Sequence, residues 1–133
     1  MKYIWCYQKG FFFDDLVQMG CVFHCVDFHS RGTNPIHDLK LLKKYKSLIR
    51  EIKPIAVLTY TIKPNVYGGM ACTALGIPYI SNITGLGDAI EKNGLLSTIA
   101  RKLYRRGLKK ANMVFFQNQT NYAYFINNKG DVE

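Results

Sequence analysis

Short apolar runs alternate with longer amphipathic segments along this chain, and this alternation constrains the fold more than any other feature. Five runs are rich in aromatic and β-branched residues: KYIWCY, VFHCVDF, IAVLTY, PYISNI and MVFFQN. A strand followed by a helix, repeated at this spacing, is typical of βαβ units and hence of a parallel sheet. The sequence therefore predicts an α/β fold with about five parallel strands and helices on both faces.

Helix signals lie between these runs. Asn34 stands as an N-cap before a segment that starts at Pro35, and Pro54 ends that segment. On a helical wheel its apolar side chains share one face: Leu41, Leu42, Tyr45, Leu48, Ile49 and Ile52. Further helices are expected at Phe11–Met19, from Pro64 to about Leu75, at Leu95–Ala111 and in the segment TNYAYFINN. The near-continuous apolar run IAVLTY predicts a strand that is covered on both faces.

The length of 133 residues suffices for one domain with a core, and the sequence has no repeat or internal domain boundary. Lys and Arg number 18 against nine acidic residues, which gives a formal net charge of +9. That excess favours an anionic partner: nucleic acid, an anionic membrane surface or a phosphorylated ligand. The N-terminus lacks the apolar core of a signal peptide, and no apolar run approaches the roughly 20 residues of a membrane span. We therefore expect a cytoplasmic protein.

Neither metal ligands nor catalytic groups stand out. Cys21 and Cys25 flank His24, but in a strand the two thiols would lie about 13 Å apart with His24 on the opposite face. The sequence also lacks a D-x-D pair, a G-x-x-x-x-G-K-[ST] loop and a G-x-G-x-x-G loop, and no Ser/His/Asp set is suggested. We expect reduced thiols, no metal and no cofactor, and the catalytic residues stay unassigned.

The segment Leu95–Ala111 divides into an apolar half and a basic half. Six cations make up the basic half: Arg101, Lys102, Arg105, Arg106, Lys109 and Lys110. One interpretation is the solvated outer face of an α/β helix, and the other is a surface that docks on anionic lipid. Nucleic acid is disfavoured, because the aromatic residues lie in the strands rather than among the cations.

Two loops, TIKPN and NITGLGD, follow predicted strands. Because ligands of open parallel sheets bind beyond the carboxyl ends of the strands, both loops belong to the expected binding edge. Pro64 suits the first position of a helix, and Lys63 beside free amides near Asn65 and Val66 would attract an anion. The alternatives are that Lys63 extends into solvent and that the NITGLGD glycines serve turn geometry alone. The predicted substrate-binding residues are Lys63, Asn65, Asn82, Thr84, Gly85 and Gly87. Gly68 and Gly69 would serve close packing of the helix.

Four segments in this order, RGTNPIHDLKLLKKY, TYTIKPNVYGG, GIPYISNITGLGDAI and ANMVFFQN, resemble the N-terminal half of bacterial glycosyltransferase family 4 enzymes with the GT-B architecture. The resemblance extends from about Cys21 to Phe125. It implies a single Rossmann-like domain over residues 1–133, the acceptor-side half of a transferase of capsular, O-antigen or exopolysaccharide synthesis. It further implies sugar transfer from a nucleotide-sugar to a lipid-linked saccharide, by a protein peripheral at the inner face of the cell membrane.

Two parts of the family pattern have no counterpart in this sequence. These are the first strand with its glycine loop and helix, and the C-terminal domain that holds the nucleotide-sugar with an E-x7-E pair. The resemblance therefore implies a donor bound by a missing or separate domain, and a chain that is inactive alone. The alternative is a non-catalytic membrane-docking or scaffold subunit that recruits a donor-binding partner. Without that first strand, we expect Tyr3–Tyr7 to pair beside Ala56–Tyr60, in the order second, first, third, fourth, fifth strand, because a buried unpaired edge is costly.

Overall fold

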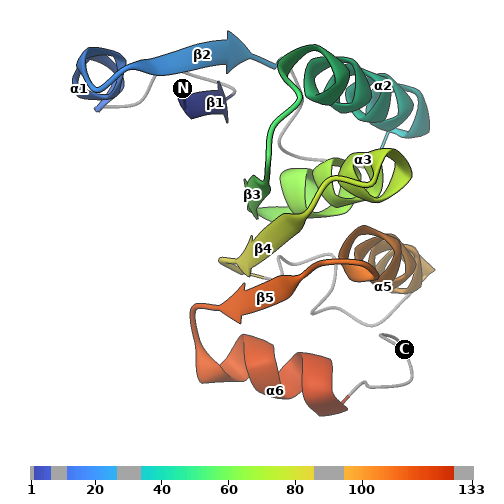
Figure 1. The fold of residues 1–133 in the computed structure, drawn as a ribbon. Helices are drawn as coiled ribbons and strands as arrows, with labels where there is room; N and C mark the ends of the chain where they lie inside the picture. The colour runs from blue at the N-terminus through green and yellow to red at the C-terminus, as the bar shows by residue number, and fades with distance from the viewer. Residues whose placement is uncertain (1, 7–11, 27–33, 86–94, 128–133) are drawn as a thin grey trace. The chain divides into compact units, whose positions relative to one another are not determined.

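The computed structural model describes residues 2–6, 12–26, 34–85 and 95–127 of the chain. These residues belong to two compact units, Met1–Leu41 and Leu42–Glu133, and each unit has its own sheet. Both sheets are parallel, and helices follow the strands (Figure 1). The predicted α/β class with a parallel sheet is therefore confirmed.

The first unit is a βαβ element. Strand β1 (Lys2–Cys6) pairs in parallel with β2 (Cys21–Cys25). Helix α1 (Phe13–Gln18) lies between them in the chain and packs on β2, where the ring centroids of Phe13 and Phe23 are 4.4 Å apart. The weak helix predicted here thus forms, anchored by one aromatic pair.

Helix α2 (Pro35–Ile52) begins at the predicted cap. The side-chain oxygen of Asn34 accepts hydrogen bonds from the backbone N–H groups of Ile36 and His37, at 3.1 and 3.4 Å. The buried apolar side chains come from the predicted face: Leu41, Tyr45, Leu48 and Ile49. Local capping and hydrophobic periodicity therefore account for both the start and the orientation of this helix.

The second unit holds a three-stranded parallel sheet in the order β3-β4-β5. Its strands are β3 (Val57–Tyr60), β4 (Tyr79–Ile83) and β5 (Met113–Phe116). After β3 the chain forms a helix that starts with a π-helical turn, η1 (Pro64–Gly68), and continues as α3 (Gly69–Leu75). The predicted helix from Pro64 to Leu75 is therefore present, with an unusually wide first turn.

Helices η1, α3 and α5 (Leu95–Leu108) lie on one side of this sheet, and α6 (Gln119–Asn127) follows β5 (Figure 1). These helices and the sheet supply deeply buried apolar side chains of the unit: Val66, Ala71, Cys72, Tyr79, Ile83 and Tyr104. The core of the second unit therefore lies between the sheet and its helices.

Glycines let η1, α3 and α5 pack backbone against backbone. A Cβ atom on Gly107 of α5 would lie 2.6 Å from the Cα atom of Val66. A Cβ atom on Gly69 would clash with the carbonyl oxygen of Gly107. One on Gly68 would press on the Thr59 methyl group at 3.2 Å. The prediction that Gly68 and Gly69 serve close packing is confirmed.

The strand order is confirmed within each unit. The second strand neighbours the first as predicted, since β1 pairs with β2, and the third, fourth and fifth strands follow in the predicted order β3-β4-β5. The predicted pairing of Tyr3–Tyr7 beside Ala56–Tyr60 would join the two units, and it stays a prediction.

One face of the second sheet, here called the open face, is apolar and exposed. Val57 and Thr59 are buried, whereas Leu58 and Tyr60 are exposed, so the prediction that IAVLTY is covered on both faces is wrong. Strand register extends the open face across the sheet: Leu58, Tyr60, Ile80, Met113 and Phe115. IAVLTY is a nearly continuous apolar run because its residues on the open face are apolar as well. Described helices cover the other face (Figure 1).

Candidate functional site

The carboxyl ends of β3, β4 and β5 meet at one edge of the second sheet because the strands are parallel. Both predicted binding loops begin at this carboxyl edge. Lys63 follows β3, and Thr84 and Gly85 follow β4. The structure therefore brings the two loops to the same edge, as predicted. Gly87 lies outside the described residues.

The turn from β3 into η1 is strained. Thr61 has a φ of +65°, which β-branched residues rarely adopt and which costs on the order of 1–3 kcal/mol. The backbone N–H of Asn65 donates to the carbonyl oxygen of Thr61 at 3.1 Å. The expectation of a free amide at Asn65 is therefore wrong. Strained dihedrals and π-helical turns both recur at functional sites, which makes this turn a candidate.

A buried polar network ties the turn to the sheet. Asn65 is fully buried, its Oδ1 accepts a hydrogen bond from the Thr59 hydroxyl at 2.7 Å, and its Nδ2 donates to the Asn82 carbonyl oxygen at 2.9 Å. The single Thr59 hydroxyl proton goes to Asn65, so the Ser81 hydroxyl, 2.9 Å away, donates to Thr59. The network joins β3, β4 and η1 in one place.

The side chains of the two predicted asparagines have different environments. Both polar groups of Asn65 are engaged inside the unit, so this residue positions the turn rather than contacting a substrate. Asn82 lies in register between Tyr60 and Phe115, on the open face. Its Oδ1 is buried and has no hydrogen-bond partner in the described part of the chain. The structure links the two residues through the Asn82 backbone alone.

Sequence reasoning missed Thr59 and Ser81. They are hydroxyl residues within the apolar runs IAVLTY and PYISNI, and they are partners in strand register. A polar side chain at an inward strand position needs a hydrogen-bond partner, because burial without one is costly. Two such positions in neighbouring strands were the signal for a buried network.

Gly85 serves neither turn geometry nor packing within the described residues. Its φ lies outside the left-handed region, and an added Cβ atom would meet nothing within 4 Å. The alternative that this glycine is needed for positive φ is therefore wrong. A glycine in that setting leaves its backbone open to the close approach of another group.

The described residues of this edge carry a cation but no carboxylate. Lys63 is partly buried at the start of the helix. Glu51, at the end of α2 and before β3, is the acidic side chain among the described residues of the second unit, and that part of the unit has no histidine. As far as these residues go, the edge can bind an anion and hydroxyl groups but supplies no general acid or base. The same residues contain no cluster of three side chains that could hold a metal ion.

Tyr104 of α5 lies beside Asn65 in the interior. Tyr104 is 2% exposed, and burial raises its pKa to about 12, partly offset by the neighbouring Asn65 side chain. Its hydroxyl has no hydrogen-bond partner among the described residues. Burial likewise raises the pKa of Cys72 to about 11. Both side chains are neutral near pH 7, so neither provides an anionic nucleophile.

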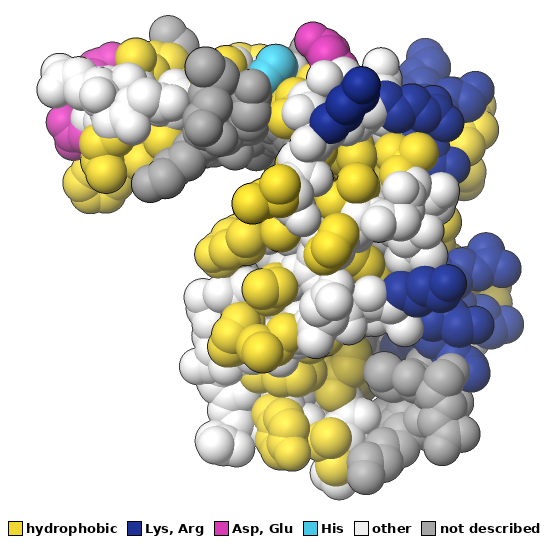
Figure 2. Space-filling view, viewed as in Figure 1, with side chains coloured by type: hydrophobic (Ala, Val, Ile, Leu, Met, Phe, Trp, Pro, Cys, Tyr) yellow, Lys and Arg dark blue, Asp and Glu magenta, His cyan; other side chains and the backbone are white. Residues whose placement is uncertain are grey.

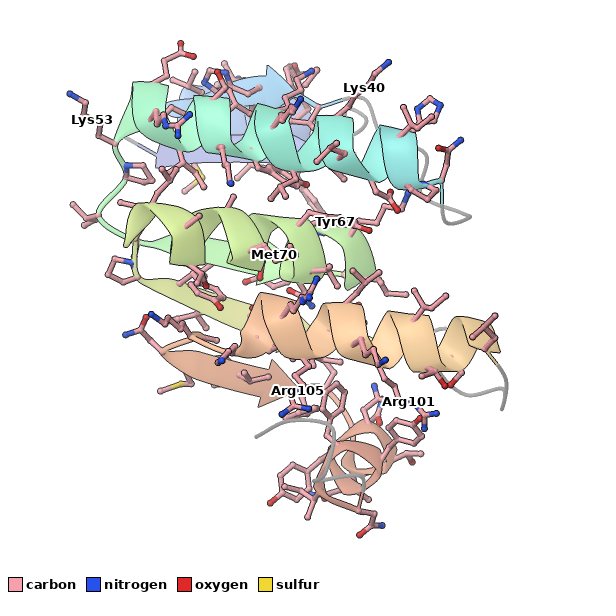
Figure 3. All side chains as sticks on the ribbon, turned by 90° about the vertical axis from the view of Figure 1, so that its right-hand side faces the viewer. Lys40, Lys53, Tyr67, Met70, Arg101 and Arg105 are labelled. Carbon is pink, nitrogen blue, oxygen red and sulfur yellow. The ribbon has the colours of Figure 1, made fainter. Side chains whose placement is uncertain are left out.

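The predicted basic half of Leu95–Ala111 is largely exposed, and part of its apolar half is buried. Helix α5 ends at Leu108, so Lys109 and Lys110 lie in the turn that follows it. Tyr104, Gly107 and Leu108 are buried. The cations are exposed at Lys102, Arg105, Arg106, Lys109 and Lys110 and half-buried at Arg101. Lys and Arg side chains gather over this helix in Figure 2, and Figure 3 labels Arg101 and Arg105 on it. Within the described residues, we find no helix with the length and apolarity needed to cross a membrane.

Comparison with known protein families gives a match over most of the chain. A family model described as glycosyl transferase 4-like matches residues 6–118. The matched segment runs from the last residue of β1 to the residue before α6, and it includes both loops of the carboxyl edge. No curated protein matches the chain.

Proposed function

Because the chain belongs to the glycosyl transferase 4-like family, we propose that it is the acceptor-side half of a GT-B glycosyltransferase of surface polysaccharide synthesis. Membership of this family implies a nucleotide-sugar donor and an acceptor. The proposed acceptor is a saccharide linked through a diphosphate to a lipid, presented at the inner face of the cell membrane. Its proposed binding site is the carboxyl edge of β3 and β4.

The observation that carries this proposal is that Lys63 and the pair Thr84 and Gly85 follow neighbouring parallel strands at one edge, where the described residues of the second unit include no carboxylate. A lysine ammonium at a helix start suits a phosphate group, and charge-assisted hydrogen bonds are the strong ones. The accessible backbone of Gly85 and the Thr84 hydroxyl suit phosphate oxygens or sugar hydroxyls. The Asn65 network holds the turn, so Lys63 would meet the phosphate with little reorganisation.

The donor requires a second binding surface. The described residues of the carboxyl edge offer no general acid or base, and one domain of a two-domain cleft cannot align two substrates. The nucleotide-sugar is therefore assigned to a separate domain or partner chain. On this proposal the chain binds the acceptor without a partner, but it transfers sugar only when the donor-binding half is present.

Two measurements test the proposal. The first is binding of a polyprenyl-diphosphate-linked sugar by the chain in neutral detergent micelles, with the corresponding monophosphate lipid as control. The second is transfer of labelled sugar, measured with the chain, with a candidate donor-binding protein and with both. We expect the diphosphate lipid to be preferred and transfer to require both proteins. Equal binding of the two lipids would contradict the assigned site, and transfer by the chain alone would contradict the need for a partner.

A further inference from the structure

We propose that Cys6 and Cys25 form a redox-sensitive dithiol, which a peroxide converts into a disulfide bond across the first sheet. The two cysteines are the last residues of β1 and β2, and strand register makes them direct partners (Figure 1). Sugar transfer assigns no role to either residue. The proposal therefore goes beyond the proposed function and does not depend on it.

Backbone geometry brings the two cysteines within bridging distance. Neighbouring strands of a sheet lie about 4.7–4.9 Å apart. The Cα atoms that a disulfide joins usually lie about 4.4–6.8 Å apart. Register partners also occupy the same face of a sheet, as a bridge between neighbouring strands requires. A disulfide can therefore form between Cys6 and Cys25 while β1 stays paired with β2.

Cys21 is not an alternative partner for Cys6. It is the first residue of β2, whereas Cys25 is the last, and its own register partner is Lys2. At roughly 3.3 Å per residue, Cys21 lies about 13 Å along the strand from Cys25. Cα atoms farther apart than about 7 Å cannot be bridged without movement of the backbone. The register therefore selects Cys25.

Access of an oxidant also distinguishes the cysteines. Cys25 is a free, exposed thiol, whereas Cys21 and Cys72 are buried. Alternation along β2 puts Cys25 on the same face as Phe23, where Phe13 of α1 packs. Helix α1 has six residues and is about 8 Å long, so it is too short to cover a strand of about 13 Å. A peroxide in solution therefore reaches Cys25 before Cys21 or Cys72.

The oxidation takes two steps. The Cys25 thiolate attacks one oxygen of hydrogen peroxide, the O–O bond breaks, and Cys25 becomes a sulfenic acid while the departing hydroxide takes up a proton and forms water. The Cys6 thiolate then attacks the Cys25 sulfur, the S–O bond breaks, and a second water leaves. Two thiols are thereby oxidised to one disulfide, and one peroxide is reduced to two waters. A thiol reductant reverses the change.

The disulfide would close a covalent ring that contains α1. Residues 6–25 run from the end of β1 through α1 to the end of β2. A bond that closes such a ring restricts the unfolded chain and so favours the folded βαβ element. We expect the backbone amides of α1 to exchange their hydrogens at least about tenfold more slowly in the oxidised chain.

Peptide mapping of the full chain tests the proposal. The reduced chain is treated with hydrogen peroxide, its remaining thiols are blocked with iodoacetamide under denaturing conditions, and it is digested with trypsin. Cleavage after lysine and arginine puts Cys6 in the peptide 3–9 and Cys25 in the peptide 10–31. We expect these two peptides to be linked, with a mass two hydrogens below the sum of their masses. Dithiothreitol should separate them.

Single substitutions locate the bond. Cys21→Ser is the matched control, because it removes the other thiol of the peptide 10–31, and it should keep the link. Cys6→Ser and Cys25→Ser should lose it. In Cys6→Ser the attacking thiol is absent, so Cys25 should remain a sulfenic acid that dimedone labels. Cys72 should be alkylated in every case. Mapping of the parent needs no substitution, so the test holds even if a variant fails to fold.

Several results would overturn the proposal. A parent chain with all four cysteines alkylated after peroxide treatment would show that no disulfide forms. A link that Cys21→Ser abolishes would show that the register does not select Cys25. Disulfide-linked dimers formed as readily by Cys6→Ser as by the parent would mean that Cys25 reacts between chains. Unchanged exchange of the α1 amides in a fully oxidised chain would contradict the reinforcement of the βαβ element.

Discussion

The side chain of Asn65 accepts a hydrogen bond from the Thr59 hydroxyl at 2.7 Å, and this bond fastens the start of η1 to β3. Asn65 also donates to the backbone of Asn82 on β4 at 2.9 Å. One fully buried side chain thereby joins two strands to the helix that follows Lys63. Any ligand bound at the carboxyl edge depends on a turn whose position Asn65 sets.

Replacing Asn65 with Leu should destabilise the chain. The substitution leaves the buried Thr59 hydroxyl without its acceptor and the Asn82 carbonyl without this donor. We expect the free energy of unfolding to fall by about 2–4 kcal/mol, measured by urea denaturation. The exposed amide of Gln117 supplies the control, since Gln117→Leu should change stability by about 0.5 kcal/mol or less. An Asn65→Leu chain as stable as the parent would show that the network contributes nothing to the fold.

Two glycines should respond to alanine in opposite ways. In Gly107→Ala, the new Cβ atom would lie 2.6 Å from the Val66 Cα atom and 2.7 Å from the Asn65 carbonyl oxygen. Backbone atoms cannot move aside as side chains do, so we expect a loss of about 1–3 kcal/mol despite the better helix propensity of alanine. In Gly85→Ala nothing lies within 4 Å, and the melting temperature should hardly change. Thermal unfolding of both variants checks the contrast, and an unaffected Gly107→Ala would rule out close helix packing.

Lys63→Met tests the proposed phosphate contact. Methionine keeps the apolar stem and removes the charge, so thermal stability should change little. Binding of a polyprenyl-diphosphate-linked sugar in neutral micelles should weaken by about tenfold or more, because a charge-assisted hydrogen bond contributes about 1.5–3 kcal/mol. Lys53→Met removes an exposed cation remote in sequence from the edge and should bind like the parent. If both variants bind equally well, Lys63 is a surface lysine without a role in binding.

Tyr104 should make the fold sensitive to alkaline pH. Burial raises its pKa in the folded chain to about 12, above the ordinary value of 10.0. Between these values the folded state binds the proton more tightly than the unfolded state, so stability falls as pH rises. The full stabilisation is present below about pH 10, and roughly 2–3 kcal/mol is lost by about pH 12.

Tyr104→Phe should remove part of that alkaline loss and leave stability near pH 7 almost unchanged. The reason is that the Tyr104 hydroxyl has no hydrogen-bond partner among the described residues. Melting temperatures across the alkaline range provide the measurement, and Tyr122→Phe, at a residue that is 48% exposed, provides the comparison. If the Tyr104→Phe chain loses stability at alkaline pH as the parent does, the Tyr104 hydroxyl is not a source of that loss.

Local features of the chain could be predicted from the sequence by itself. The Asn34 side chain accepts hydrogen bonds from residues two and three positions further along the chain, and the apolar face of α2 repeats within a few turns. Gly76 ends α3 with a φ of +68°, which glycine adopts without steric cost. The burial of Tyr104 and Leu108 and the exposure of Arg105 and Arg106 in α5 follow from the same periodicity. Each of these depends on near neighbours in sequence, and short-range sterics and hydrogen bonding decide them.

Tertiary structure alone decided which face of the second sheet is covered and which site residues face inward. Lys63 and Asn65 are two residues apart in one motif, yet Asn65 is buried because Thr59 and the Asn82 backbone offer it partners. Leu58 is as apolar as Val57, yet it is exposed because the described helices pack on the other face. Such outcomes depend on contacts between residues that are distant in the chain. The local composition of a segment does not determine those contacts.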